Sequence, residues 1–137
     1  MEQILDRLWL GDATDAEALK YSRGAVLTLN EDIPRLISSI MHVHAPIPDE
    51  VFLPPPIWIE LLHTLTQLVH QYSVVLVHCR LGVSRSPALV AAYLAWCGHS
   101  QDPERALAYV KGKRRRVNVH PETWSGVIAW WGRHQCR

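Results

Sequence analysis

The chain has 137 residues, of which 48% are hydrophobic, and its formal net charge is +1. This length suits one compact domain and leaves little room for a second. A net charge so near zero gives no bulk attraction to nucleic acids or membranes, so any argument from charge has to be local.

The sequence lacks the features of secreted and membrane-inserted proteins. The stretch MEQILDRLWLGD has acidic residues where a signal peptide would be basic, and the longest apolar stretches are too short to cross a bilayer. The cysteines Cys79, Cys97 and Cys136 cannot all pair with one another, and their spacing does not suggest zinc. We therefore expect a cytoplasmic monomer with free thiols, with no metal or cofactor and with neither nucleic acid nor membrane as a partner.

The first half of the chain predicts two short strands, a stiff loop and a helix. The strands are AVLTL at 25–29 and MHVHA at 41–45. The proline-rich stretch APIPDEVFLPPP, residues 45–56, cannot be a helix interior or a central strand, so it predicts a loop. Apolar residues then recur at helical spacing over 57–71, which predicts an amphipathic helix.

The second half begins with VVLVH at 74–78, a β-branched run typical of a strand buried on both faces. SPALVAAYLAWCG, residues 86–98, predicts a helix that ends at Gly98. Two more helices are predicted in 102–113 and 120–131, each with a proline at its first position and the former with an aspartate N-cap.

Strands that alternate with helices predict an α/β fold, with a mostly parallel central sheet covered by helices on both faces. We expect residues 1–137 to form one such domain. Open sheets of this kind bind their ligands at the carboxyl ends of the strands, which directs attention to the residues that follow 74–78.

The stretch HCRLGVSRS, residues 78–86, has the composition of an anion cradle. Main-chain N–H groups of a loop that feeds a helix can converge on one point, where the helix N-terminus adds its own free donors. Gly82 allows a backbone geometry that a side chain would obstruct, and Arg85 can fold over the anion and bind two oxygens. A tetrahedral dianion fits such a site. The expected phosphate-binding residues are Arg80, Leu81, Gly82, Val83, Ser84 and Arg85.

The same positive field favours the thiolate form of Cys79 at neutral pH. A thiolate beneath a bound phosphate can attack phosphorus and form a phosphocysteine intermediate. Ser86 is placed to donate a hydrogen bond to the sulfur when it leaves again. His78 is expected to hold the loop through hydrogen bonds and is not assigned as a base.

H-C-x5-R-S is the signature of the cysteine-dependent protein tyrosine phosphatases, and HCRLGVSRSPALVAAYL resembles their dual-specificity branch. The opening ILDRLWLGDATDAEAL is also similar to the start of dual-specificity domains. The resemblance spans nearly the whole chain, although only the loop is highly specific. It implies a sheet of four or five strands, no metal, and hydrolysis in two steps through a phosphocysteine.

The family also uses an aspartate as general acid, on a loop about thirty residues before the cysteine. Asp49 lies at that spacing, in the proline-rich loop. It would protonate the leaving oxygen and then, as carboxylate, activate water. The neighbouring Glu50 is a weaker candidate for this task, and a turn aspartate without function is the plain alternative for Asp49.

The basic run KGKRRR, residues 111–116, is open to two interpretations. It is either a solvated helix end, where cations suit the dipole, or a surface that steers phosphate. The family resemblance implies that Asn118 and one arginine of 114–116 contribute near the site, although the sequence motif usual for the family is absent there. Cys97 should lie about 20 Å from Cys79, too far for a disulfide.

The leading functional hypothesis is a phosphatase that acts on phosphotyrosine and on phosphoserine or phosphothreonine in proteins, because a chain this small leaves little material for a deep pocket. Phosphoinositides and RNA 5′-triphosphate ends are alternative substrates. A phosphate-binding module without turnover is the non-enzymatic alternative, which Cys79, Arg85 and Ser86 together disfavour.

Overall fold

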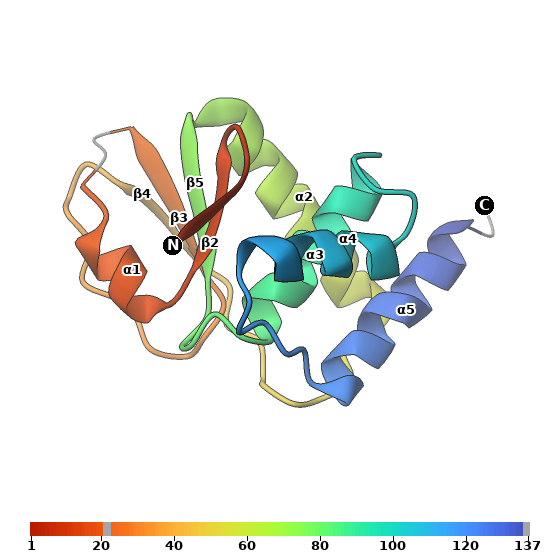
Figure 1. Ribbon diagram of the computed structural model, residues 1–137. Coiled ribbons are helices and arrows are strands. Elements are labelled where there is room, and N and C mark those ends of the chain that lie inside the picture. The colour runs from red at the N-terminus through yellow and green to blue at the C-terminus, as the bar shows by residue number, and fades with distance from the viewer. Residues whose placement is uncertain (21–22, 136–137) are drawn as a thin grey trace.

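The computed structural model describes residues 1–20 and 23–135 (Figure 1). They form a five-stranded sheet in the order β1-β2-β5-β3-β4, in which β1 is antiparallel to β2 and all other neighbours are parallel. The strands are β1 (Glu2–Leu5), β2 (Leu8–Gly11), β3 (Gly24–Thr28), β4 (Met41–His44) and β5 (Val74–His78). The predicted α/β class with a mostly parallel sheet is confirmed.

The central strand β5 is buried on both faces, as its composition predicts. Val75 and Val77 belong to the large core, whereas Leu76 belongs to a smaller core on the opposite face of the sheet. The same alternation holds for β3, where Val26 faces the smaller core. Because successive residues of a strand point to opposite faces, an unbroken apolar run serves both cores.

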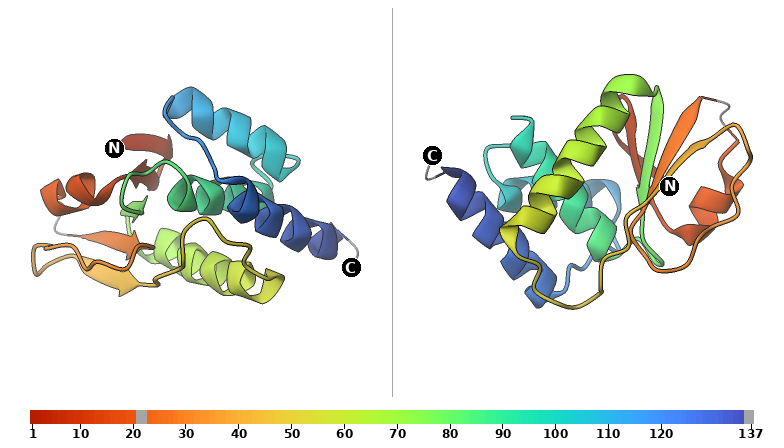
Figure 2. Two further views of the ribbon diagram at one scale, coloured as in Figure 1. Left: turned by 90° about the horizontal axis from the view of Figure 1, so that it is seen from below. Right: turned by 180° about the vertical axis from the view of Figure 1, so that it is seen from behind.

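The helices cover the two faces unequally (Figure 2). The short helix α1 (Ala13–Ala18) packs its Ala16 into the smaller core. The other four helices form the large core with the opposite face. They are α2 (Pro55–Gln71), α3 (Arg85–Trp96), α4 (Pro103–Lys113) and α5 (Pro121–Gln135).

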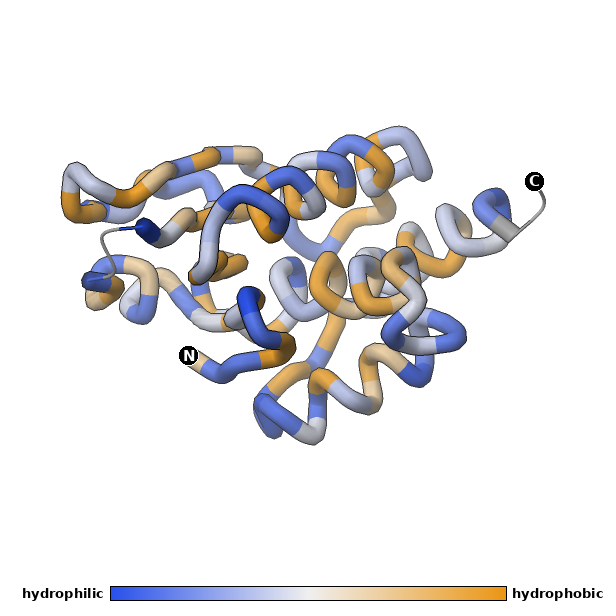
Figure 3. The backbone as a smooth tube through the Cα atoms, turned by 90° about the horizontal axis from the view of Figure 1, so that it is seen from above, coloured by the Kyte–Doolittle hydropathy of each residue, from blue (hydrophilic) through white to orange (hydrophobic). Residues whose placement is uncertain are grey.

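Helix α3 lies at the centre of this group and is buried on nearly all sides. Every residue from 85 to 95 is buried. Figure 3 shows hydrophobic stretches along the helices at the centre of the molecule. The helix runs directly from the end of the loop after β5. The loop is therefore attached to the most thoroughly packed helix of the domain, which favours a fixed loop conformation.

Helix ends follow the predicted signals, with one correction. Gly98 has φ +82 just after α3, and the side chain of Asp102 caps α4 by accepting from the Arg105 N–H. The prediction that residues 45–56 are all loop is wrong for its last two prolines, because α2 begins at Pro55. A proline costs nothing in the first helical turn, where its missing N–H would have no partner.

Cys79 is buried and Cys97 is exposed, and both are free thiols; Cys136 lies outside the described residues. Over residues 1–20 and 23–135, no helix is long and apolar enough to span a bilayer.

Candidate active site

Cys79 follows β5 directly, at the carboxyl edge of the sheet, and α3 begins at Arg85. The Cys79 residue is 3% exposed. Its Sγ lies 3.1 Å from the Oγ of Ser86, in the first turn of α3. The loop, the nucleophile candidate and the helix N-terminus are thus brought together as the sequence motif predicts.

The loop turns its carbonyl groups outward. The carbonyls of residues 80–83 all accept hydrogen bonds of 2.8–3.2 Å from groups behind the loop. The donors are the main-chain N–H groups of Ala13 and Asn118 and the guanidinium groups of Arg114 and Arg116. Among the described residues, none accepts a hydrogen bond from the N–H groups of residues 80–85. With the carbonyls fixed outside, these N–H groups form the donor set that an anion requires.

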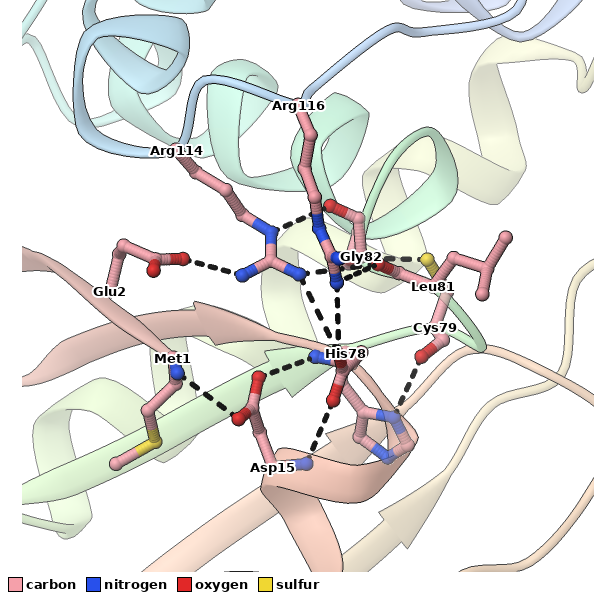
Figure 4. Close-up of polar contacts among 11 residues, drawn as sticks. Met1, Glu2, Asp15, His78, Cys79, Leu81, Gly82, Arg114 and Arg116 are labelled. Atoms are coloured by element: carbon pink, nitrogen blue, oxygen red, sulfur yellow. Dashed lines mark hydrogen bonds and ion pairs between the residues drawn. The ribbon is translucent and has the colours of Figure 1, made fainter.

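Arg114 is the main support of the loop (Figure 4). It is 6% exposed, its Nε donates to the Gly82 carbonyl at 3.0 Å and its Nη2 donates to the Leu81 carbonyl at 3.2 Å. The carboxylate of Glu2 pairs with its Nη1. Arg114 immediately follows α4, whose last residue is Lys113. It is therefore neither a solvated helix end nor a steering charge, since it is buried behind the loop.

Gly82 is required by both its backbone angle and its surroundings. Its φ is +67, in the left-handed region that favours glycine. A Cβ at this position would lie 2.6 Å from the Gly11 carbonyl oxygen and 2.7 Å from Nη2 of Arg114. The loop consequently packs against β2 and Arg114 at a distance that only glycine permits.

Arg85 is 5% exposed and is held by groups that are distant in sequence. Its Nη1 donates to the Ile47 carbonyl at 3.0 Å and to the carboxylate of Glu31 at 3.1 Å. Its Nε lies 3.7 Å from Oδ1 of Asp49 and makes no hydrogen bond to any residue that the structure describes. Glu31 was missed by the sequence analysis, because nothing in its local sequence indicates that it reaches Arg85.

A pocket of about 340 Å³ opens above this loop. Cys79, Arg85, Asp49 and Glu50 line it, so the proline-rich loop does approach the cysteine. The Asp49 side chain is 47% exposed, and its Oδ1 accepts from the Glu50 N–H at 3.0 Å. The remaining lining residues are Arg80, Leu81, Val83, Ser84, Asn118, Val119, His120 and Pro121.

His78 holds the loop from below through a chain of hydrogen bonds. Its Nδ1 lies 3.1 Å from the Cys79 carbonyl and must donate to it. In the neutral ring Nε2 then accepts from the Thr28 hydroxyl at 2.8 Å. That hydroxyl in turn accepts from Nε2 of His42 at 2.8 Å. One set of tautomers satisfies all three contacts, so the chain of donors is fixed.

Burial lowers the pKa of both histidines in this hydrogen-bond network, which favours their neutral forms. It lowers the pKa of His78 below 6.5, against the opposing effects of the Cys79 carbonyl and of two nearby carboxylates. Burial, and the proximity of His44, also lower the pKa of His42. The sequence analysis expected His78 to hold the loop but did not connect it with Thr28 or His42. No cluster of three possible metal ligands occurs in the part of the chain that the structure describes.

A sequence model of the dual specificity phosphatase catalytic domain matches residues 35–132. The chain belongs to this family. It is 31% identical to the mouse protein phosphatase Slingshot homolog 1 over 81% of this chain and 11% of that protein. It is 33% identical to the Drosophila melanogaster dual specificity protein phosphatase Mpk3 over 88% of this chain and 31% of that protein. The chain thus spans about a tenth to a third of the length of these relatives.

Solved structures confirm the predicted fold. Human DUSP28 superposes with a TM-score of 0.81 at 18% identity, covering 99% of both chains. A mouse putative dual specificity phosphatase complexed with zinc tungstate gives a TM-score of 0.84 at 20% identity, covering 98% of this chain and 88% of that one. The family resemblance read from the loop is therefore correct.

Proposed function

We propose that residues 1–137 form one catalytic domain that hydrolyses phosphomonoesters of proteins through a phosphocysteine. The observation that carries the proposal is the set of N–H groups of residues 80–85, which have no acceptor among the described residues and belong to the loop that lines one pocket with Cys79. These donors match the oxygens of a phosphate dianion, and Arg85 adds positive charge where negative charge develops. The protein itself supplies this charge, so no step requires a metal or a cofactor.

In the first step Cys79 Sγ attacks phosphorus. A sulfur–phosphorus bond forms as the bond between phosphorus and the ester oxygen breaks, and Asp49 donates its proton to that leaving oxygen. In the second step the Asp49 carboxylate takes a proton from water while the water oxygen attacks phosphorus. The sulfur leaves as thiolate, which accepts a hydrogen bond from Ser86, and inorganic phosphate is released.

Protein phosphoesters are the favoured substrates, because the sequence relatives reported above are named as protein phosphatases. We propose that phosphotyrosine and phosphoserine or phosphothreonine all enter the pocket. The free thiols of Cys79 and Cys97 are consistent with the cytoplasmic setting proposed here.

Hydrolysis of p-nitrophenyl phosphate by the full chain tests this function. The wild type should turn over and be inhibited by vanadate. Cys79→Ser should lose about a thousandfold or more in kcat, since the hydroxyl is a far poorer nucleophile than a thiolate. Arg85→Lys keeps the charge but loses the forked donor set, and should lose about a hundredfold. Thermal melting of both variants checks that the fold is intact. If folded Cys79→Ser hydrolyses p-nitrophenyl phosphate as fast as the wild type, the mechanism is wrong.

A further inference from the structure

One side of the pocket rim is strongly acidic. Glu31 and Asp49 converge on the same guanidinium, that of Arg85, from two different loops. Glu50 is exposed and lines the pocket next to Asp49. Asp32 is 75% exposed and pairs with the side chain of Arg80 at 3.0 Å. Four carboxylates therefore lie along the segments that follow β3 and β4.

The positively charged side chains of the pocket already have carboxylate partners within the protein. Among the described residues that line it, the permanently charged cations are Arg80 and Arg85. Arg80 is balanced by Asp32. Arg85 is buried and lines the pocket, and among the described residues its Nε has no hydrogen-bond partner. A buried donor without a partner is costly, and an anion at the base of the pocket would supply an acceptor for this group.

Binding of a phosphate dianion leaves the rim short of positive charge. Once Arg85 compensates the phosphate, it no longer fully neutralises Glu31, and Glu50 shares the pocket with the dianion. Cations supplied by the substrate itself would remove this imbalance. Leu81, which is 63% exposed, and Val119 offer apolar surface in the same pocket. The aliphatic stems of lysine and arginine pack on surfaces of this kind while their charged ends reach outward.

We propose that this domain selects phosphopeptides that carry lysine or arginine next to the phosphorylated residue. The inference rests on the phosphatase function proposed above and specifies its substrate class. The acidic rim repels polyanions, so it disfavours anionic membrane surfaces and RNA ends as substrates. The selecting residues are Glu31, Asp32 and Glu50, whereas Asp49 is reserved for proton transfer.

Two phosphotyrosyl peptides of equal length test the proposal, one with lysines on both sides of the phosphotyrosine and one with glutamates. The wild-type chain should show a kcat/KM about tenfold higher for the lysine peptide at low ionic strength, from a few exposed ion pairs. The ratio should fall towards unity in high salt, because salt screens exposed charges. The double variant Asp32→Asn, Glu50→Gln should reduce the ratio to about threefold or less.

A matched control removes the same charge elsewhere. Glu60 and Glu104 are exposed residues of α2 and α4 that do not line the pocket, and Glu60→Gln with Glu104→Gln should keep the full preference. A ratio of one or below in the wild type overturns the inference, as does a double variant Asp32→Asn, Glu50→Gln whose ratio stays above about threefold. Faster hydrolysis of phosphoinositide vesicles than of either peptide also overturns it.

A failure of the proposed phosphatase function can be distinguished from a failure of this inference. If the wild-type chain does not hydrolyse p-nitrophenyl phosphate, the phosphatase function is wrong and the inference fails with it. If it hydrolyses p-nitrophenyl phosphate but does not distinguish the two peptides, the function stands and the inference alone is wrong.

Discussion

Replacing Gly82 by alanine tests how the loop is held, and Gly98 provides a matched control. Both glycines have positive φ, +67 and +82. A Cβ on Gly98 would meet nothing within 4 Å, whereas a Cβ on Gly82 would lie 2.6 Å from the Gly11 carbonyl oxygen. Gly98→Ala should therefore lower the free energy of unfolding by about 1 kcal/mol, the strain of an alanine in the left-handed conformation. Gly82→Ala should cost about 1–3 kcal/mol more, because main-chain atoms of β2 have to move.

Urea or thermal unfolding measures this difference. For a chain of this size, each kcal/mol lowers the Tm by about 3–5 °C. Gly82→Ala should also lose about a hundredfold or more in kcat/KM for p-nitrophenyl phosphate, since displacement of the loop misaligns its N–H donors. Gly98→Ala should keep its activity. If Gly82→Ala unfolds and turns over like Gly98→Ala, the close approach to β2 does not hold the loop.

Three further predictions concern the chemistry and the histidine chain. Asp49→Asn should slow hydrolysis of an alkyl phosphate by about a hundredfold and that of p-nitrophenyl phosphate far less, because the latter leaving group needs no proton; equal losses would remove Asp49 from this role. Ser86→Ala should slow release of the sulfur by about tenfold or more and produce a burst of nitrophenol; an unchanged kcat without a burst contradicts it. The free energy of unfolding should decrease as the pH falls below about 6.5, because His78 and His42 bind protons more readily in the unfolded chain. The urea midpoint should therefore drop between pH 7.5 and 5.5, and drop less in His42→Gln; an equal drop in both proteins contradicts the assignment of His42.

The sequence predicted those parts of the fold that depend on local patterns. The run at 74–78 is apolar from 74 to 77, as a strand buried on both faces requires, and the structure has a strand there. The cap at Asp102 depends on a side chain and a main-chain N–H three residues away, so it is also a local signal. The order of strands in the sheet depends on which surfaces meet after folding. No local pattern in the chain specifies it.

The candidate active site likewise contains residues that a local pattern predicts and residues that only the folded structure brings together. Cys79, Ser86 and Arg85 lie within one short segment, so their relationship is visible in the sequence, and the structure brings them together. Glu31 and Arg114 reach the loop through contacts over more than thirty residues. Their positions depend on where β3 lies in the sheet and on how α4 packs against α3 and β1.

The histidine chain shows how an alignment of strands creates a contact that spacing does not suggest. Thr28 lies opposite His78 in the register of β3 and β5 and opposite His44 in the register of β3 and β4. His42, two residues before His44, is therefore on the same face and reaches the Thr28 hydroxyl. In the sequence alone His42 carries no functional signal, because the register that joins it to His78 is tertiary.

Direct observation of the covalent intermediate tests the central claim. The full chain is mixed with p-nitrophenyl phosphate, quenched in acid within its first turnover and measured by intact-protein and peptide mass spectrometry. We predict one added phosphoryl group per chain, located on Cys79 and absent from Cys79→Ser. Turnover by the wild type with no phosphoryl group on Cys79 at any quench time, or with the group on another residue, contradicts the mechanism.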